Sequence, residues 1–160
     1  MCRIYRNTQR TVGIDIYEPY LHFCKRHELY DELMMCDVAQ NRLPLGDKTF
    51  ELATCVEVIE HLPKPAGVKL LRDLERVASR VVITTPGTYH EQEAYDANPW
   101  QRHVSEWHVD DFEQEGYKVH GLANAKIFVR YPLLTVPLSP LLLRFPRLAS
   151  SYLCIKDCVS

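Results

Sequence analysis

Acidic side chains end three β-like runs of this sequence. Asp15 closes a β-branched run, Asp37 follows a short apolar run, and Glu57 closes a third run. A carboxylate can accept hydrogen bonds from two neighbouring hydroxyls of a ribose, and a second carboxylate suits an exocyclic amine. The apolar neighbours of these acids could hold a flat purine; they are Ile16, Val38 and Val56. The pattern therefore predicts a nucleoside site, without naming the nucleoside.

The runs that carry these acids predict an α/β fold. The expected strands are residues 11–16, 32–35, 50–56, 80–84, 117–122 and 151–156. A helix is expected at 66–78, where apolar residues recur three and four positions apart. Parallel strands joined by helices bring their carboxyl ends to one edge of the sheet, where ligands bind. The three acids are therefore expected to share that edge.

Length and composition indicate one globular domain. The chain has 160 residues, of which 46% are hydrophobic and 25% charged, and its net charge is −2. This composition excludes a disordered tail or a coiled coil, and the charge balance makes nucleic acid an unexpected partner. Six cysteines without a Cys-x-x-Cys pair, and an N-terminus without an apolar signal core, predict reduced thiols in a cytoplasmic protein.

Short motifs follow one another in an order shared with a known family. They are residues 12–16, 37–38, 43–45, 50–52, 57–62 and 82–87. Over roughly residues 11–122 the chain resembles a class I S-adenosylmethionine-dependent methyltransferase, and is most similar to small archaeal and bacterial type 11-like members. The most specific part is the Glu-Val-Ile-Glu-His-Leu block at 57–62, in its spacing to Asp15 and Asp37.

The resemblance implies a fold and an adenosine site. The fold would be Rossmann-like, with a doubly wound, mostly parallel sheet, and the cofactor would be S-adenosyl-L-methionine. Asp15 would hold the ribose hydroxyls, and Ile16 would pack on the adenine. Asp37 would accept from the adenine amine, with the Val38 backbone beside it.

The resemblance also implies where the reacting end of the cofactor lies. Val56 and Glu57 would border its methionine end. His61 and an aromatic loop at residues 89–107 would face the methyl acceptor, which is an unidentified small molecule, sugar or lipid-like compound. His103 is the first candidate for a general base and His61 the second.

The chain departs from the family pattern at its start. The family begins with a strand and a glycine-rich turn that lets the backbone approach the cofactor, and no such turn precedes Gly13. We interpret the chain as N-terminally truncated, with the first strand and glycine turn missing. The alternative is a catalytically silent methyltransferase-like binding module. A weaker alternative is an NAD or nucleotide-sugar enzyme, because an acid after the second strand also suits NAD.

Each candidate residue also has a purely structural interpretation. Asp15 could cap a helix, and one of Glu57 and Glu60 is expected to be a solvated acid in the first turn of a helix. His61 could serve packing, and His103 could be an ordinary loop histidine. His103 and His108 are five positions apart, which does not place them on one helix face, so no metal site is expected.

The domain organisation follows from composition along the chain. Residues 1–10 form an irregular arm, 11–122 the methyltransferase-like domain, and 123–160 a Leu/Pro-rich segment with a last strand that packs on the same domain. Residues 131–143 are too short and too proline-rich to span a membrane, so core packing is expected, with lipid contact as the alternative. The sheet edge left bare by the missing strand predicts self-association.

Overall fold

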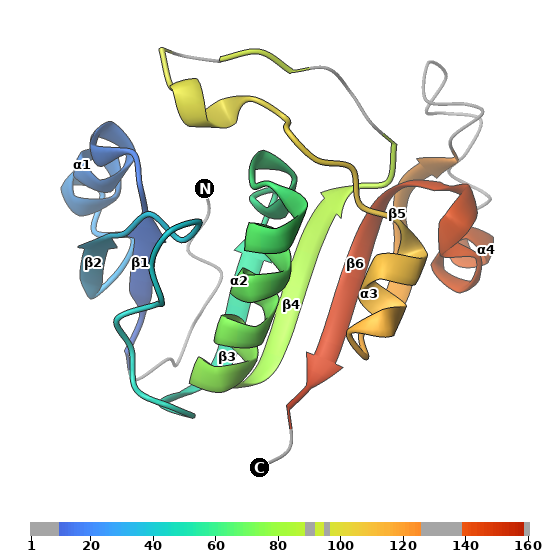
Figure 1. The fold of residues 1–160 in the computed structure, drawn as a ribbon, viewed down its shortest axis with the longest axis horizontal. Coiled ribbons are helices and arrows are strands. Elements are labelled where there is room, and N and C mark those ends of the chain that lie inside the picture. The colour runs from blue at the N-terminus through green and yellow to red at the C-terminus, as the bar shows by residue number, and fades with distance from the viewer. Residues whose placement is uncertain (1–9, 89–91, 95–96, 126–138, 159–160) are drawn as a thin grey trace. The chain divides into compact units, whose positions relative to one another are not determined.

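The computed structural model describes residues 10–88, 92–94, 97–125 and 139–158. The chain divides into two compact units, an N-terminal unit, Met1–Arg42, and a C-terminal unit, Leu43–Ser160. Figure 1 labels the elements of both, and each unit is described by itself.

The N-terminal unit is a β-α-β element. β1 (Val12–Asp15) pairs in parallel with β2 (Glu32–Met35), and α1 (Glu18–Arg26) connects them. Pro19 lies in the first turn of α1, where its missing N–H costs nothing. The strands expected at 11–16 and 32–35 are confirmed, and their parallel pairing brings their carboxyl ends to one edge.

Gly13 allows β1 to pack tightly in this unit. A Cβ at this position would lie 2.8 Å from Leu33 Cδ2 and 2.8 Å from Tyr30 Cδ2. Gly13→Ala is therefore expected to destabilise the unit by about 1–3 kcal/mol through overpacking. Hydrogen exchange of the β1 and β2 amides should be about 5- to 150-fold faster. Gly46→Ala is the control, because a Cβ there meets only a methyl group of the Thr49 side chain; equal exchange in both variants would contradict the prediction.

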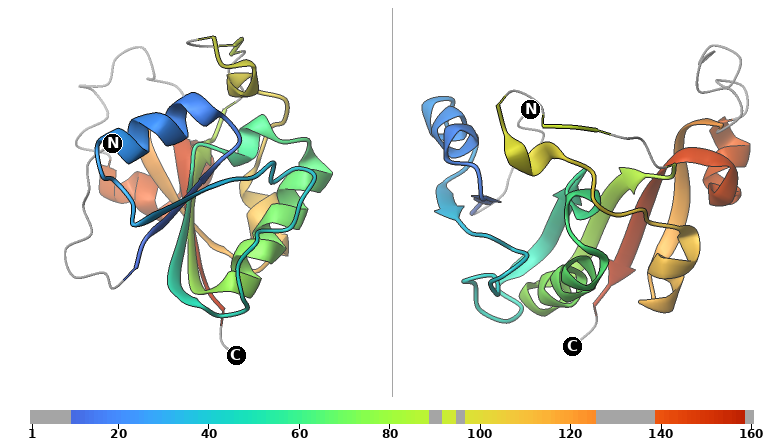
Figure 2. Two further views of the ribbon diagram at one scale, coloured as in Figure 1. Left: turned by 90° about the vertical axis from the view of Figure 1, so that its left-hand side faces the viewer. Right: turned by 45° about the horizontal axis from the view of Figure 1, so that its top comes forward.

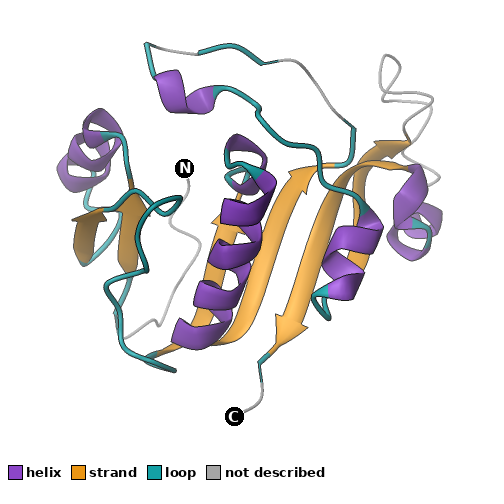
Figure 3. Ribbon diagram, in the orientation of Figure 1, coloured by secondary structure: helices purple, strands orange, loops and turns teal. Residues whose placement is uncertain are grey.

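The C-terminal unit contains a four-stranded sheet in the order β3-β4-β6-β5 (Figure 3). Its strands are β3 (Phe50–Val56), β4 (Ala78–Pro86), β5 (Lys118–Ala125) and β6 (Ala149–Asp157). β3 and β4 are parallel, whereas β6 runs antiparallel to both β4 and β5. The α/β, Rossmann-like class is confirmed, and the strand expected at 151–156 is the centre of β6.

Helices cover this sheet and connect its strands. The longer elements are α2 (Lys64–Val77), α3 (Val109–Gln114) and α4 (Ser139–Arg144); the short ones are η1 (Ile59–His61), η2 (Pro99–Gln101) and η6 (Pro146–Leu148). α2 and α3 lie on the same face of the sheet (Figures 1 and 2). α2 buries Leu71, Leu74 and Val77, as the periodicity predicted, although the helix begins and ends earlier than the expected 66–78.

Arg76 fastens the loop before β3 to α2. Its guanidinium donates to Asp73 Oδ1 at 2.6 Å, to the Leu43 carbonyl at 2.9 Å, and to the Leu45 carbonyl and Asp47 Oδ1 at 2.7 Å each. Asp73 also accepts from the Leu43 N–H. These bonds satisfy the buried Asp73 carboxylate, whose charge would otherwise be costly to bury.

Two expectations concern the surface of the protein: membrane or lipid contact by residues 131–143, and self-association along an open edge of the sheet. Among the described residues, no helix is long and apolar enough to cross a membrane. Most of the segment 131–143 lies outside the described residues, so the choice between packing and lipid contact stays a prediction. β3 ends the four-stranded sheet, and its Leu52 and Val56 are 39% and 58% exposed; self-association along this edge likewise stays a prediction.

Candidate functional site

Asp15 and Asp37 lie at the carboxyl ends of neighbouring strands in the N-terminal unit. Asp15 is the last residue of β1 and is in register with Met35, the last residue of β2. The Cys36 N–H donates to the Asp15 carbonyl over 3.0 Å, so the chain leaves β2 directly beside Asp15. Asp37 follows one residue later. The structure thus brings both predicted acids to one edge of the parallel pair, which is where such sheets bind ligands.

Each of these carboxylates uses one oxygen to hold the turn after its strand. Asp15 Oδ1 accepts from the Tyr17 N–H over 2.8 Å, and Asp37 Oδ1 accepts from the Ala39 N–H over 2.9 Å. Tyr17, not Asp15, is the N-cap of α1, so the capping alternative for Asp15 does not describe this turn. Neither Oδ2 has a hydrogen-bond partner among the described residues, and both can accept from a ligand.

The other predicted cofactor contacts are divided between the two units. Ile16 and Val38 are half-buried beside the two acids. Val56 and Glu57 belong to the C-terminal unit, at the carboxyl end of β3, and Val56 is 58% exposed. Glu57 has a φ of 51°, and its N–H donates to the Thr84 carbonyl over 3.0 Å. This left-handed residue, uncommon for a non-glycine, turns the chain out of β3 and toward η1.

Of the two acids that follow β3, Glu60 is buried and Glu57 is the solvated one. Only 4% of the Glu60 surface is exposed, whereas Glu57 is exposed. Glu60 Oε2 accepts from the Thr85 hydroxyl over 3.0 Å, and Oε1 has no hydrogen-bond partner among the described groups. Burial raises the pKa of Glu60 from 4.5 to about 7, and the nearby Glu57 carboxylate adds to this rise. The left-handed backbone at Glu57 redirects the chain into η1, where the Glu60 side chain is buried.

His61 and His103 lie together beside Glu60. Their ring centroids are 4.9 Å apart, although the residues are far apart in sequence. His61 Nδ1 is 3.0 Å from the Arg102 carbonyl, and because a carbonyl can only accept, this nitrogen carries the proton. Burial lowers the pKa of His61, which favours the neutral imidazole. Both predicted catalytic histidines are therefore neighbours, in a half-buried position.

Backbone hydrogen bonds hold the His103 segment against η1. The N–H groups of Val104 and Ser105 donate to the Glu60 carbonyl, over 3.0 and 3.1 Å. Farther along, Trp107 Nε1 donates to the Ile59 carbonyl over 3.2 Å and to Ser105 Oγ over 2.9 Å. These contacts join two stretches that are distant in sequence, so their geometry is set by tertiary packing.

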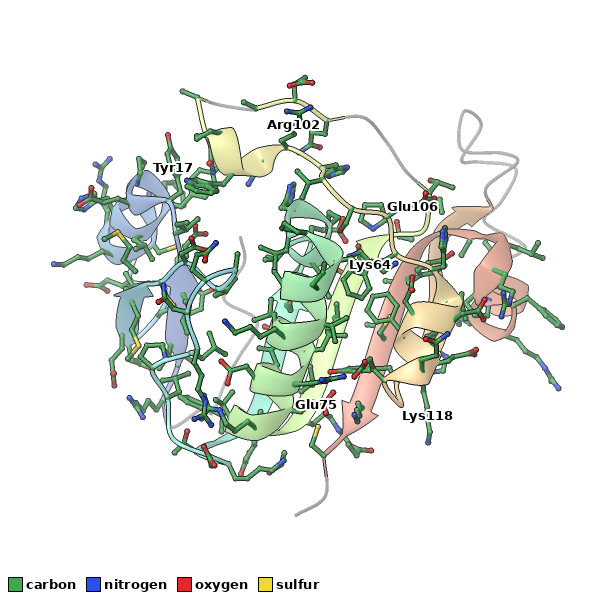
Figure 4. All side chains as sticks on the ribbon, viewed as in Figure 1. Tyr17, Lys64, Glu75, Arg102, Glu106 and Lys118 are labelled. Atoms are coloured by element: carbon green, nitrogen blue, oxygen red, sulfur yellow. The ribbon has the colours of Figure 1, made fainter. Side chains whose placement is uncertain are left out.

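Lys64 connects α2 to the segment 103–107 through a hydrogen bond to the Glu106 carbonyl. Its Nζ donates to the Glu106 carbonyl over 2.7 Å and to Asp111 Oδ2 over 2.5 Å, and it lies 4.8 Å from the centre of the Trp107 ring. Figure 4 labels Lys64 and Glu106 at this contact. The segment that carries His103 is thereby fastened to η1 at one end and to α2 at the other.

The aromatic loop expected to face the acceptor is only partly available for that role. Trp107 is 1% exposed and packs in the core, so its assignment to an acceptor-facing surface is wrong. Trp100 is 52% exposed and stays a candidate, whereas Tyr89 and Tyr95 lie outside the described residues. The sequence pattern gave Glu60 no functional role, although its adjacency to His61 within the block 57–62 is a signal that points to one.

These features define a Rossmann-like α/β protein with acids at the carboxyl ends of parallel strands. The chain belongs to the family described as "Methyltransferase domain", whose sequence profile matches residues 1–81. The predicted class I methyltransferase relationship is confirmed, and S-adenosylmethionine is the cofactor of that family.

Solved structures share this fold. A SAM-dependent methyltransferase from Archaeoglobus fulgidus has a TM-score of 0.56 and 17% identity, covering 90% of this chain and 74% of that one. A protein of Bacillus halodurans assigned as a methyltransferase has a TM-score of 0.57 and 17% identity, covering 93% and 83%. A chain of the Haloferax volcanii complex between the Trm112 methyltransferase activator and a methyltransferase has a TM-score of 0.61 and 12% identity, covering 99% and 75%. No curated protein sequence matches the chain.

Proposed function

We propose that the chain binds S-adenosyl-L-methionine through Asp15 and Asp37. The methyl group of this cofactor is then transferred to an acceptor nucleophile. The observation that carries this proposal is the pair of carboxylates at one edge of β1 and β2, each with one oxygen that has no hydrogen-bond partner among the described residues. Ribose hydroxyls and the adenine amine are donors, and these two oxygens are acceptors, so the donor set fits. Ile16 and Val38 supply half-buried apolar surface for a purine beside them.

At its methionine end, the cofactor carries the methyl group that is transferred. When bound, the cofactor supplies a methyl group on a sulfonium, which a nucleophile in line can accept without further activation of the methyl. The work left to the chain is positioning, which can contribute up to about 7–11 kcal/mol. His103 and His61 are the proposed proton acceptors for a hydroxyl or amine acceptor, an effect of about 10²–10⁴-fold. We also propose that the methyl acceptor is a small molecule, a sugar or a lipid-like compound, and that the protein is located in the cytoplasm.

Calorimetric titration with S-adenosylmethionine and S-adenosylhomocysteine tests the cofactor site. Asp15→Asn keeps an oxygen for the Tyr17 N–H but replaces the unused oxygen with an NH₂ donor that cannot accept from a ribose. We expect the variant to bind about 10- to 150-fold more weakly, since a hydrogen bond to a charged group contributes about 1.5–3 kcal/mol.

Glu18→Gln is the matched control for this titration. It removes the same charge from a largely exposed side chain on α1, and it should leave cofactor affinity within about twofold of the wild type. Absence of binding by the wild-type chain, or equal affinities of Asp15→Asn and the wild type, would overturn the proposal.

A further inference from the structure

Glu60, His61 and His103 form a cluster of metal-ligating side chains in the C-terminal unit. One donor atom from each lies within 4.8 Å of the others. Donor atoms around one tetrahedral ion, each about 2.0–2.2 Å from it, are about 3.3–3.6 Å apart. The present limit of 4.8 Å is wider than that spacing by about 1.2–1.5 Å, so rotation of the side chains would have to bring the donors together around an ion.

The buried carboxylate of Glu60 is the group that a cation would explain. One oxygen accepts from Thr85, and the other, Oε1, is buried without a hydrogen-bond partner among the described groups. Leaving a buried acceptor unsatisfied costs about 1–3 kcal/mol, and more when it is charged. A cation beside Oε1 would satisfy this oxygen, and a nitrogen of each imidazole lies within 4.8 Å of an oxygen of this carboxylate.

His61 has the orientation that a metal ligand needs. Its Nδ1–H donates to the Arg102 carbonyl over 3.0 Å, which leaves the lone pair on Nε2. Figure 4 labels Arg102 on the segment that supplies this carbonyl. Histidine ligands to metals commonly donate their second ring N–H to a carbonyl or carboxylate, which fixes both the tautomer and the ring.

His103 is positioned by its backbone before any ion binds. Its N–H donates to the Gln92 carbonyl over 3.1 Å, and the next two N–H groups donate to the Glu60 carbonyl. The ligand from the distant segment is thus anchored to the same turn that carries the other two ligands. Such preorganisation lowers the entropy that binding would otherwise lose.

We infer that Glu60, His61 and His103 bind a divalent transition-metal cation. Two imidazole nitrogens and one carboxylate oxygen suit ions such as zinc, iron or cobalt, and three protein ligands leave coordination positions open for water or substrate. The site goes beyond cofactor binding by Asp15 and Asp37, which are in the N-terminal unit, and it gives His61 and His103 a second role besides that of proton acceptor. An imidazole that ligates an ion has no lone pair left for a proton, so metal binding and the general-base role exclude each other in one molecule.

Titration of the full chain with Co²⁺ alone, followed by calorimetry and absorption, tests this site without any methyl donor. We expect one ion per chain and a spectrum without a thiolate-to-metal band, because the cysteines are not ligands. His103→Gln and Glu60→Gln should each weaken Co²⁺ binding at least about tenfold, since loss of even an outer-shell partner costs 10–100-fold. Gln at position 60 can still accept from Thr85, which favours a folded variant.

The control is His22→Gln, which removes an exposed imidazole from α1, far from the cluster in sequence. It should bind Co²⁺ as the wild type does. Circular dichroism checks that each variant is folded; if Glu60→Gln unfolds, His103→Gln, at a half-buried surface position, decides the question. Absence of binding, a thiolate band, or wild-type affinity in His103→Gln would overturn the inference. None of these outcomes bears on cofactor binding.

Discussion

Replacing Trp107 by alanine is expected to lower the free energy of unfolding of the C-terminal unit by about 3–5 kcal/mol. The indole is 1% exposed, its ring centroid lies 5.1 Å from that of Phe112, and its Nε1 donates to the Ile59 carbonyl. The ring fits against Gly67, where a Cβ would lie 2.3 Å from Trp107 Cζ2. Alanine would leave a cavity at the junction of α2, α3 and η1, and such a site cannot collapse fully.

Urea unfolding followed by circular dichroism measures this effect. Trp100→Ala is the matched control, because Trp100 is 52% exposed and its loss should change the free energy of unfolding by no more than about 0.5 kcal/mol. The chain has two tryptophans, so the Trp100 variant also leaves Trp107 as the sole fluorescence reporter of the core. If Trp107→Ala lowers the free energy of unfolding by less than about 1 kcal/mol, the prediction that this indole is a main core contact of the C-terminal unit is wrong.

Raising the pH from 4.5 to 7 is expected to destabilise the metal-free protein through Glu60 by about 3 kcal/mol. The folded-state pKa of Glu60 is raised by burial to about 7, against 4.5 for an ordinary glutamate. Below pH 4.5 both states hold the proton, and above pH 7 both have released it. Between these values only the unfolded chain has lost it, so unfolding releases a proton and higher pH favours unfolding.

The difference between wild type and Glu60→Gln isolates this contribution. His61, whose pKa is lowered, acts in the opposite direction below pH 6.5, but it does so in both proteins. Exposed carboxyls with lowered pKa, such as Asp110 and Asp157, act below pH 3.8, outside this range. Urea unfolding in the presence of a chelator at several pH values should show the two stability curves diverging between pH 4.5 and 7. Parallel curves would mean that folding does not raise the pKa of Glu60.

Much of the fold follows from local sequence patterns. Apolar runs and helical periodicity located β1, β2, β3, α2 and β6, because side-chain burial repeats along the chain with the period of each element. The edge that carries Asp15 and Asp37 was also predictable, since a parallel pair joined by one helix must align its carboxyl ends. The resemblance to methyltransferases was confirmed by the family match, which covers residues 1–81.

The tertiary structure decided the surroundings of the histidines. Glu57 and Glu60 are three residues apart and chemically alike, yet one is exposed and the other buried, because the left-handed backbone at Glu57 redirects the chain. His103 joins His61 through hydrogen bonds from Val104 and Ser105 to the Glu60 carbonyl. No local periodicity encodes such a contact between distant segments.

Sequence by itself thus determined the family, the strand and helix order, and the edge that holds the two aspartates. Only packing decided that Trp107 is core and that Glu60, His61 and His103 meet. The physical reason is that burial of an individual side chain depends on which distant segments pack over it, whereas strand and helix formation depend mainly on neighbours along the chain.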